Sequence, residues 1–118
     1  MNEDTKVVAS PEELDSGLVE VAAEVLSLLS DATRIRIVKA LQGCELTVNE
    51  LAKLVGKRPA TVSQHLAKLR WAKAVQARHD GNRVFYTLVD EHLLALVNQA
   101  LMQAEHVLSA APSHHKEG

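Results

Sequence analysis

Residues 45–88 have the sequence ELTVNELAKLVGKRPATVSQHLAKLRWAKAVQARHDGNRVFYTL, and this stretch contains the signals that decide the fold. In its first part, apolar residues recur at the spacing of one helix face, at Leu46, Val48, Leu51, Leu54 and Val55. Gly56 then interrupts the pattern, and glycine readily adopts the left-handed conformation that ends many helices. We therefore expect a helix that ends at Gly56.

A second helix is predicted a few residues later. Proline fits the first turn of a helix because no hydrogen bond is lost there, and Pro59 occupies such a position. Val62, Leu66 and Leu69 follow as a stripe that would face inward. The other faces are polar, with Thr61, Ser63, Gln64, His65 and Lys68. Two helices joined by a tight turn predict a helix-turn-helix, whose second helix would present this polar face to a DNA groove.

The rest of the stretch has the pattern of a β-hairpin. Two segments rich in strand-forming residues, Ala74–His79 and Arg83–Leu88, flank the turn sequence Asp80-Gly81-Asn82. A hairpin after a helix-turn-helix predicts a wing. Arg78, His79 and Arg83 would gather at its tip, where they would either reach a phosphate or minor groove or form a merely solvated turn.

Composition favours one helical domain. The chain has 118 residues, of which 47% are hydrophobic but only 3% aromatic, so the core must be built from aliphatic side chains. Cys44 is the only cysteine, which excludes an intrachain disulfide and leads us to expect a buried, unreactive thiol. No apolar run approaches the roughly 18 residues of a membrane span, and the acidic start lacks the apolar core of a signal peptide. We therefore expect a cytosolic protein.

Charge is distributed unevenly along the chain. The formal net charge is −2, but residues 31–88 contain eleven Lys and Arg side chains against four Asp and Glu. The flanking segments contain the other two basic residues and the other eleven acidic ones. Basic side chains gathered on one module can neutralise phosphates and release counterions, so this segment favours binding to duplex DNA.

The segments on either side predict further helices and a dimer. Ser10 can cap a helix that starts at Pro11, and its apolar set between Leu14 and Leu29 is wide enough to serve as a core helix or to cover a partner subunit. A second helix over DATRIRIVKALQ would be capped by Ser30-Asp31, bury Ile35, Val38 and Leu41, and end at Gly43.

The last predicted helix follows Val89 and is apolar on more than one side, which indicates an antiparallel partner helix from a second chain. We thus expect a mainly α fold with a small β-hairpin, a winged helix-turn-helix that is dimeric through its N- and C-terminal helices. Its expected organisation is a disordered N-terminus (residues 1–10), one DNA-binding and dimerisation domain (residues 11–108) and a flexible histidine-containing tail (residues 109–118).

Asp90, His92 and His106 form a candidate metal site. The two histidines lie about 21 Å apart along a helix but within about 40° of the same face, so one chain cannot close the site. Two antiparallel helices would bring Asp90 and His92 of one chain beside His106 of the other, twice per dimer. Such ligands suit Zn²⁺, Co²⁺ or Ni²⁺. Alternatively, Asp90 only starts the helix and both histidines are solvated.

From about Leu14 to Leu108 the chain resembles the arsenic-repressor (ArsR/SmtB) family of metal-responsive winged-helix repressors. The resemblance lies in LSDATRIRIVKALQG, ELTVNELAKLVG, TVSQHLAKLR and GNRVFYTL. It implies a homodimer whose recognition helix enters the major groove, whose last helices form the dimer seam, and which represses when metal-free and leaves DNA when metal binds.

The resemblance also implies which sensing site is present. The family's thiolate site has cysteines at positions matching Thr47 and Asn49, so that soft-metal site is absent. The site on the last helix matches Asp90, His92, Gln103 and His106, with Gln103 where the family usually has histidine. The fourth ligand would be water, the Gln103 oxygen, or a tail histidine, His114 or His115.

These observations lead to one main hypothesis: a repressor that binds operator DNA as a homodimer and is released by zinc, nickel or cobalt at two intersubunit sites. In the alternative, the same DNA-binding dimer responds to another signal and the metal site is degenerate; a protein-binding module is a further possibility. We do not expect an enzyme, because no further acid–base cluster accompanies Asp90 and His92. His65 either contacts DNA or lies against a neighbouring element. The predicted DNA contacts are Lys57, Arg58, Thr61, Ser63, Gln64, His65, Lys68, Arg70, Arg78, His79 and Arg83.

Overall fold

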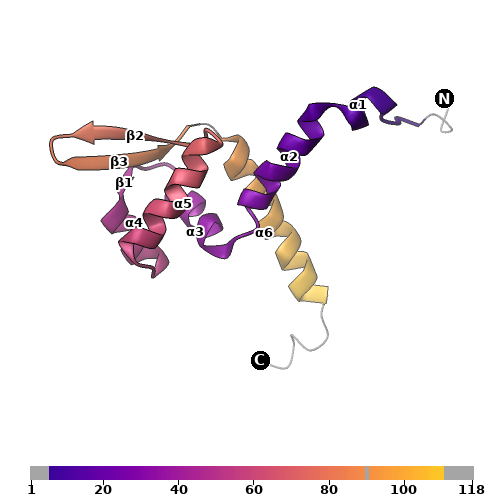
Figure 1. Ribbon diagram of the computed structural model, residues 1–118. Coiled ribbons are helices and arrows are strands. Elements are labelled where there is room, and N and C mark those ends of the chain that lie inside the picture. Colours follow the sequence, from indigo (N-terminus) through magenta and orange to yellow (C-terminus); the bar gives the residue numbers. More distant parts are fainter. Residues whose placement is uncertain (1–5, 90, 111–118) are drawn as a thin grey trace.

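Nine elements make up the computed structural model, which describes residues 6–89 and 91–110 (Figure 1). In chain order they are α1 (Pro11–Asp15), α2 (Gly17–Leu28), α3 (Ala32–Ala40), β1 (Leu46–Thr47), α4 (Val48–Val55), α5 (Pro59–Trp71), β2 (Val75–Asp80), β3 (Arg83–Leu88) and α6 (His92–Ala110). Helices α4 and α5 are the predicted helix-turn-helix, and β2 and β3 are the wing.

Individual residues set the start and end of the helices in the helix-turn-helix. Thr47 caps α4, because its hydroxyl accepts from the Glu50 backbone N–H while the Glu50 carboxylate accepts from the Thr47 N–H. Gly56 ends the helix with a left-handed φ of 70°, and Pro59 opens α5. The predicted apolar face of α4 is wrong at two positions. Leu46 lies before the cap, in β1, and Leu54 is exposed.

The wing belongs to a three-stranded antiparallel sheet with the order β1-β3-β2. Strands β2 and β3 pair from Val75 opposite Leu88 to Asp80 opposite Arg83, which leaves a two-residue turn with Gly81 at φ 61°. Strand β1 is the addition to the expected hairpin: Leu46 pairs with Tyr86. Two residues are too few for a recognisable strand pattern, which is why the sequence did not reveal β1.

The N-terminal helix is broken where one continuous helix was expected. Ser10 caps α1 as predicted, with a capping box to Glu13. Ser16 then adopts an extended conformation, with φ −70° and ψ 153°, and its hydroxyl donates to the Glu13 carbonyl oxygen. Serine hydrogen-bonds to nearby backbone in this way in competition with helix formation, so α2 starts anew at Gly17.

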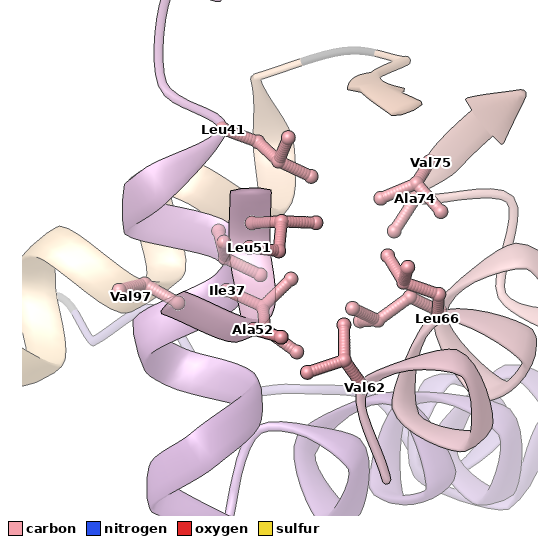
Figure 2. Packing of buried hydrophobic residues seen from close by; sticks show 11 residues of the cluster. Ile37, Leu41, Leu51, Ala52, Val62, Leu66, Ala74, Val75 and Val97 are labelled. Carbon is pink, nitrogen blue, oxygen red and sulfur yellow. The ribbon is translucent and has the colours of Figure 1, made fainter. Parts of the chain in front are cut away.

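The core lies between α3, α4, α5 and the start of the wing, and Val97 of α6 is buried in it (Figure 2). The side chains that are at most 2% exposed are Ile37, Val38, Leu41, Leu51, Val62, Leu66, Leu69 and Val97. Each such aliphatic side chain contributes about 1.5–3 kcal/mol by leaving water. The inward stripe of α5 is confirmed. On α3, Ile37 is fully buried. Ile35 is only partly buried, because it lines an open groove between α3, α4 and α6.

Two helices have large apolar surfaces outside this core. Helix α2 has no buried residue and projects with α1 away from the body, while α6 contributes only Val97 to the buried set (Figure 1). The Cα radius of gyration is 18.5 Å, against about 13 Å for a compact domain of this size. Cys44 is exposed rather than buried; it follows the end of α3, and its thiol donates to the Ala40 carbonyl oxygen at 3.2 Å.

Candidate nucleic-acid interface and metal-ligating face

Helix α5 exposes part of its predicted polar face. Val62, Leu66 and Leu69 hold the helix against the core, and Gln64 lies almost directly opposite this buried stripe. Ser63 is also exposed, whereas Thr61 is half-buried on one flank. The predicted phosphate contacts around the helix are all exposed: Lys57 and Arg58 before it, and Lys68 and Arg70 near its end. This surface therefore combines two uncharged polar side chains with four cations.

His65 is directed towards the protein rather than fully into solvent. Its ring is half-buried, and its Nδ1 lies 3.1 Å from Nη1 of Arg34 on α3. Burial lowers the pKa of His65, so the neutral ring is favoured. Of the two roles considered for this residue, contact with a neighbouring element is the one that the described contacts show.

On the wing, Arg78 is engaged within the domain. Its Nε and Nη2 donate to the two carboxylate oxygens of Glu45, at 2.9 and 2.7 Å. The guanidinium also lies 4.8 Å from the centre of the Phe85 ring, which Arg83 approaches to 5.0 Å. The paired Arg78 lowers the pKa of Glu45, and Glu45 raises that of Arg78. Arg78 is thus paired with the residue before β1 although 52% of its side chain is exposed, and His79 is exposed as well.

Arg83 stands beside a shallow depression of about 380 Å³ between the wing and the start of α4. Asn49, Glu50 and Lys53 line it from α4, and Asn82 from the turn. The cap hydrogen bond from Thr47 is the main cause of the low pKa of Glu50, and Arg83 lowers it further. Lys53 therefore belongs to the same basic surface as Arg83. Lys53 was not among the predicted contacts, because it lies on the first helix of the motif.

Three of the four predicted metal ligands can be placed on α6. With about 100° of rotation per residue, His92, Gln103 and His106 lie within about 60° of one another around the helix axis. All three are exposed, and Val97, which packs on α3, lies on the opposite side of the helix. Asp90, His114 and His115 lie outside the described residues. His92, Gln103 and His106 therefore share one exposed face of α6.

The described residues of one chain do not bring a set of metal ligands together. Within residues 6–89 and 91–110, no three His, Cys, Asp or Glu side chains lie together in a group that could hold a metal ion. Across the same ranges, no helix is long and apolar enough to cross a membrane.

Comparison with known proteins identifies the family. Residues 31–73 match the model of the family described as "Bacterial regulatory protein, arsR family". The chain is 44% identical over 108 residues to the HTH-type transcriptional regulator KmtR of Mycobacterium tuberculosis, covering 92% of this chain and 83% of that protein. It is 38% identical over 89 residues to the cadmium resistance transcriptional regulatory protein CadC homolog of Staphylococcus aureus, covering 74% and 73%.

A solved structure gives the same result. The homodimeric winged helix-turn-helix DNA-binding domain Mb0332 of Mycobacterium bovis superposes with a TM-score of 0.72 at 25% identity, covering 93% of this chain and all of that one. The expected winged helix-turn-helix is thereby confirmed, and so is the resemblance drawn from the sequence. The chain belongs to the arsR family of bacterial regulatory proteins and is a transcriptional regulator, not an enzyme.

Proposed function

We propose that the protein represses transcription as a homodimer bound to operator DNA, and that a transition metal bound between the two α6 helices releases it. The observation that carries the proposal is the placement of His92, Gln103 and His106 on one exposed face of α6, opposite the side that packs on α3. A ligand face on α6, at the proposed dimer interface, puts the metal where it can change the distance between the two DNA-binding modules.

Exposed apolar side chains support the dimer. They lie on α1 and α2 and again on α6: Leu14, Leu18, Val19, Val21 and Leu26, then Leu96, Leu101, Met102, Val107 and Leu108. Patches of this extent mark interaction sites in soluble proteins. The related Mb0332 domain is described as homodimeric. We assign α1, α2 and α6 to one interface between two copies of the chain.

For DNA binding, we assign base or phosphate contacts to Thr61, Ser63 and Gln64 and phosphate contacts to Lys57, Arg58, Lys68 and Arg70. On the wing, His79 and Arg83 are the proposed contacts. Arg78 would contact DNA only after its ion pair with Glu45 breaks. On α5, His65 would do so only after its contact with Arg34 breaks. The two recognition helices of a dimer must lie about 34 Å apart to enter successive major grooves. The dimer seam sets that distance.

The donor set fits a borderline metal ion better than a soft one. His92 and His106 offer imidazole nitrogens, Gln103 offers an amide oxygen, and no thiolate is on this helix. Asp90 of the other chain would supply a carboxylate. We therefore propose Zn²⁺, Ni²⁺ or Co²⁺ at two sites per dimer, with His114 or His115 as further ligands where six-fold coordination is preferred. The CadC homolog's name refers to cadmium. Cys44 is the only cysteine here, and one thiol cannot form the cysteine cluster that this soft ion prefers.

Release follows from linkage. A metal shifts a conformational equilibrium only by binding one state more tightly, so it must favour the dimer geometry that fits DNA less well. DNA must then weaken metal binding by the same factor. A coupling of 1–3 kcal/mol, typical of allosteric proteins, would change operator affinity by about 5- to 150-fold.

The test is a titration of the protein–DNA complex with each metal. A fluorescent duplex recovered by in vitro selection on the wild-type protein serves as probe, and anisotropy reports binding. We expect metal to weaken binding of the wild type, with His106→Ala insensitive. Glu105→Ala, a neighbour turned about 100° away on α6, is the matched control and should respond like the wild type.

Two results would contradict the metal proposal: operator affinity that none of the three metals changes, or a His106→Ala variant that responds normally. Either would favour the second candidate, a repressor of the same family that answers another signal. The observation in its favour is Gln103 itself, because an amide oxygen is a poor zinc ligand.

A further inference from the structure

Arg34 connects three helices through a single side chain. Its Nε donates to the carbonyl oxygen of Leu28, the last residue of α2, at 2.6 Å. Its Nη1 lies 3.1 Å from Nδ1 of His65 on the recognition helix α5, while its backbone is part of α3. The donors of a guanidinium are fixed in one plane, so the two contacts cannot be adjusted independently. The position of α5 is thereby tied to the end of α2.

The two contacts differ in the group that Arg34 meets. The Leu28 carbonyl is one of the last four of α2, and these carbonyls accept no hydrogen bond from within their own helix. Arginine only donates, so His65 must accept through an unprotonated Nδ1. The bridge therefore requires a particular protonation state of one ring.

The surroundings of His65 favour that state. Burial is the largest influence and lowers its pKa, and among the charged neighbours three cations lower it while one carboxylate raises it. These neighbours come from α3 and its cap, from α5 and from the turn before it: Arg34, Asp31, Lys68 and Lys57. On the side of α2, Glu24 borders the groove that Arg34 and Lys68 also line.

We propose that Arg34 and His65 are positioning residues that set the angle of the recognition helix relative to the dimer helix α2. The inference rests on the proposed DNA-binding dimer, and it concerns specific binding only. A phosphate contact adds affinity for any duplex, whereas a change in helix angle misplaces side chains that read base edges. Loss of the bridge should therefore reduce preference for the operator and leave non-specific binding intact.

The first test compares Arg34→Lys and Arg34→Gln with the wild type, all in chelator so that the metal response plays no part. Two duplexes of about 30 base pairs are used, one selected on the wild type and one of unselected sequence. Lysine keeps the charge but loses the planar fork. We expect both variants to lose about tenfold in affinity for the selected duplex, which is the equivalent of one charge-assisted hydrogen bond. Their affinity for the unselected duplex should not change.

The matched control is Lys68→Gln, a proposed phosphate contact on the same helix. It should weaken both duplexes and reduce the slope of log affinity against log salt by about 0.9, whereas the Arg34 variants should keep the wild-type slope. Circular dichroism confirms that each variant folds. A normal Arg34→Lys variant, or an Arg34→Gln variant that behaves like Lys68→Gln, would overturn the proposal. A wild type that prefers no duplex would instead overturn the DNA-binding function.

The second test uses His65 and remains informative if the Arg34 variants fold poorly. Asparagine places an acceptor oxygen at the same distance from the backbone as Nδ1, and phenylalanine fills the space without an acceptor. We expect His65→Asn to retain the preference for the selected duplex and His65→Phe to lose about tenfold. Equal affinities for these two variants would contradict an acceptor role.

Acidification provides the spectroscopic and functional signature. Protonation of Nδ1 removes the acceptor, so the operator preference of the wild type should fall below about pH 6.5, the ordinary pKa of histidine. The preference of His65→Asn should not change over this range. Nitrogen NMR of the His65 ring should show unprotonated Nδ1 at about pH 8. A protonated Nδ1 there would refute the bridge.

Discussion

Arg78 and Glu45, 33 residues apart in sequence, form a two-pronged ion pair with Nε–Oε2 and Nη2–Oε1 distances of 2.9 and 2.7 Å. The pair ties β2 of the wing to the residue before β1. An arginine that the sequence places among the DNA contacts is thus held by a carboxylate of its own domain, with the Phe85 ring beneath it.

Glu45→Gln should strengthen DNA binding. The substitution releases the Arg78 guanidinium and adds one unit of positive charge to the wing, so non-specific affinity should rise and the salt slope should steepen by up to about 0.9. Anisotropy titrations at several salt concentrations measure both. Glu91→Gln, which removes the same charge away from the wing, is the control. An unchanged slope in Glu45→Gln would mean that released Arg78 does not reach a phosphate.

Asp31 should make stability depend on acid pH. Its carboxylate accepts from the Arg34 backbone N–H at the start of α3, and this cap is the main cause of its lowered pKa. A lowered folded-state pKa gives stability that is present above the ordinary value of 3.8 and is lost as pH falls through the folded value.

The measurement is urea unfolding of the wild type and of Asp31→Asn across this range. Asparagine also caps helices but does not titrate, so its disadvantage should shrink towards low pH. Asp31→Ala, which removes the cap, should cost about 1 kcal/mol at neutral pH. A gap between wild type and Asp31→Asn that grows on acidification would contradict the assigned cap.

Gly56→Ala should destabilise the fold by about 1–2 kcal/mol, because its φ of 70° is a conformation that disfavours a Cβ atom although the space around it is open. Gly17→Ala is the counterpart in this chain. It has neither a positive φ nor a neighbour within 4 Å of the added Cβ, so it should be neutral or stabilise by up to about 1 kcal/mol. Equal effects in thermal or urea unfolding would exclude left-handed strain at Gly56.

Leu66→Ala should cost about 2–5 kcal/mol, since its side chain is 1% exposed in the middle of the core. Leu54→Ala removes the same atoms from a side chain that is 65% exposed on α4, and it should change stability by less than about 0.5 kcal/mol. Denaturant unfolding of the two variants compares them directly. A large loss in Leu54→Ala would show that Leu54 is covered by a second molecule.

Val107→Glu should convert the proposed dimer into monomers and abolish specific DNA binding. Val107 is 61% exposed on α6 in the single chain, and a carboxylate there would be buried without a partner at the seam. Sedimentation velocity checks the mass. Leu54→Glu, similarly exposed but outside α2 and α6, should remain dimeric; a dimeric Val107→Glu would place the seam elsewhere.

The fold could be predicted where one local signal decides the structure. Gly56 and Pro59 determine their turn through backbone conformation alone, and the stripe of Val62, Leu66 and Leu69 has no alternative buried face. Elements that depend on distant partners were missed. Strand β1 exists because Tyr86 pairs with Leu46, 40 residues away. Leu54 is exposed because none of the described residues covers it.

The same distinction applies to the candidate site. The polar residues of α5 and the spacing of His92, Gln103 and His106 follow from helical periodicity, and the structure has a continuous α6 across all three. The partners of Arg78 and His65 could not be predicted, because Glu45 and Arg34 reach them only after the chain has folded. Charge alone does not indicate whether an arginine is available to DNA.

Helix α2 starts anew after the break at Ser16 and buries no residue in its own chain, so the amount of active regulator depends on how many chains have assembled. An isolated helix of 12 residues is marginal in water, so α2 gains its stability from the second copy in the proposed dimer. Completion of the fold is then a bimolecular step, and stability rises with protein concentration. At low copy number, halving the supply of chains would reduce the assembled regulator about fourfold by mass action, giving a steep threshold without any effector.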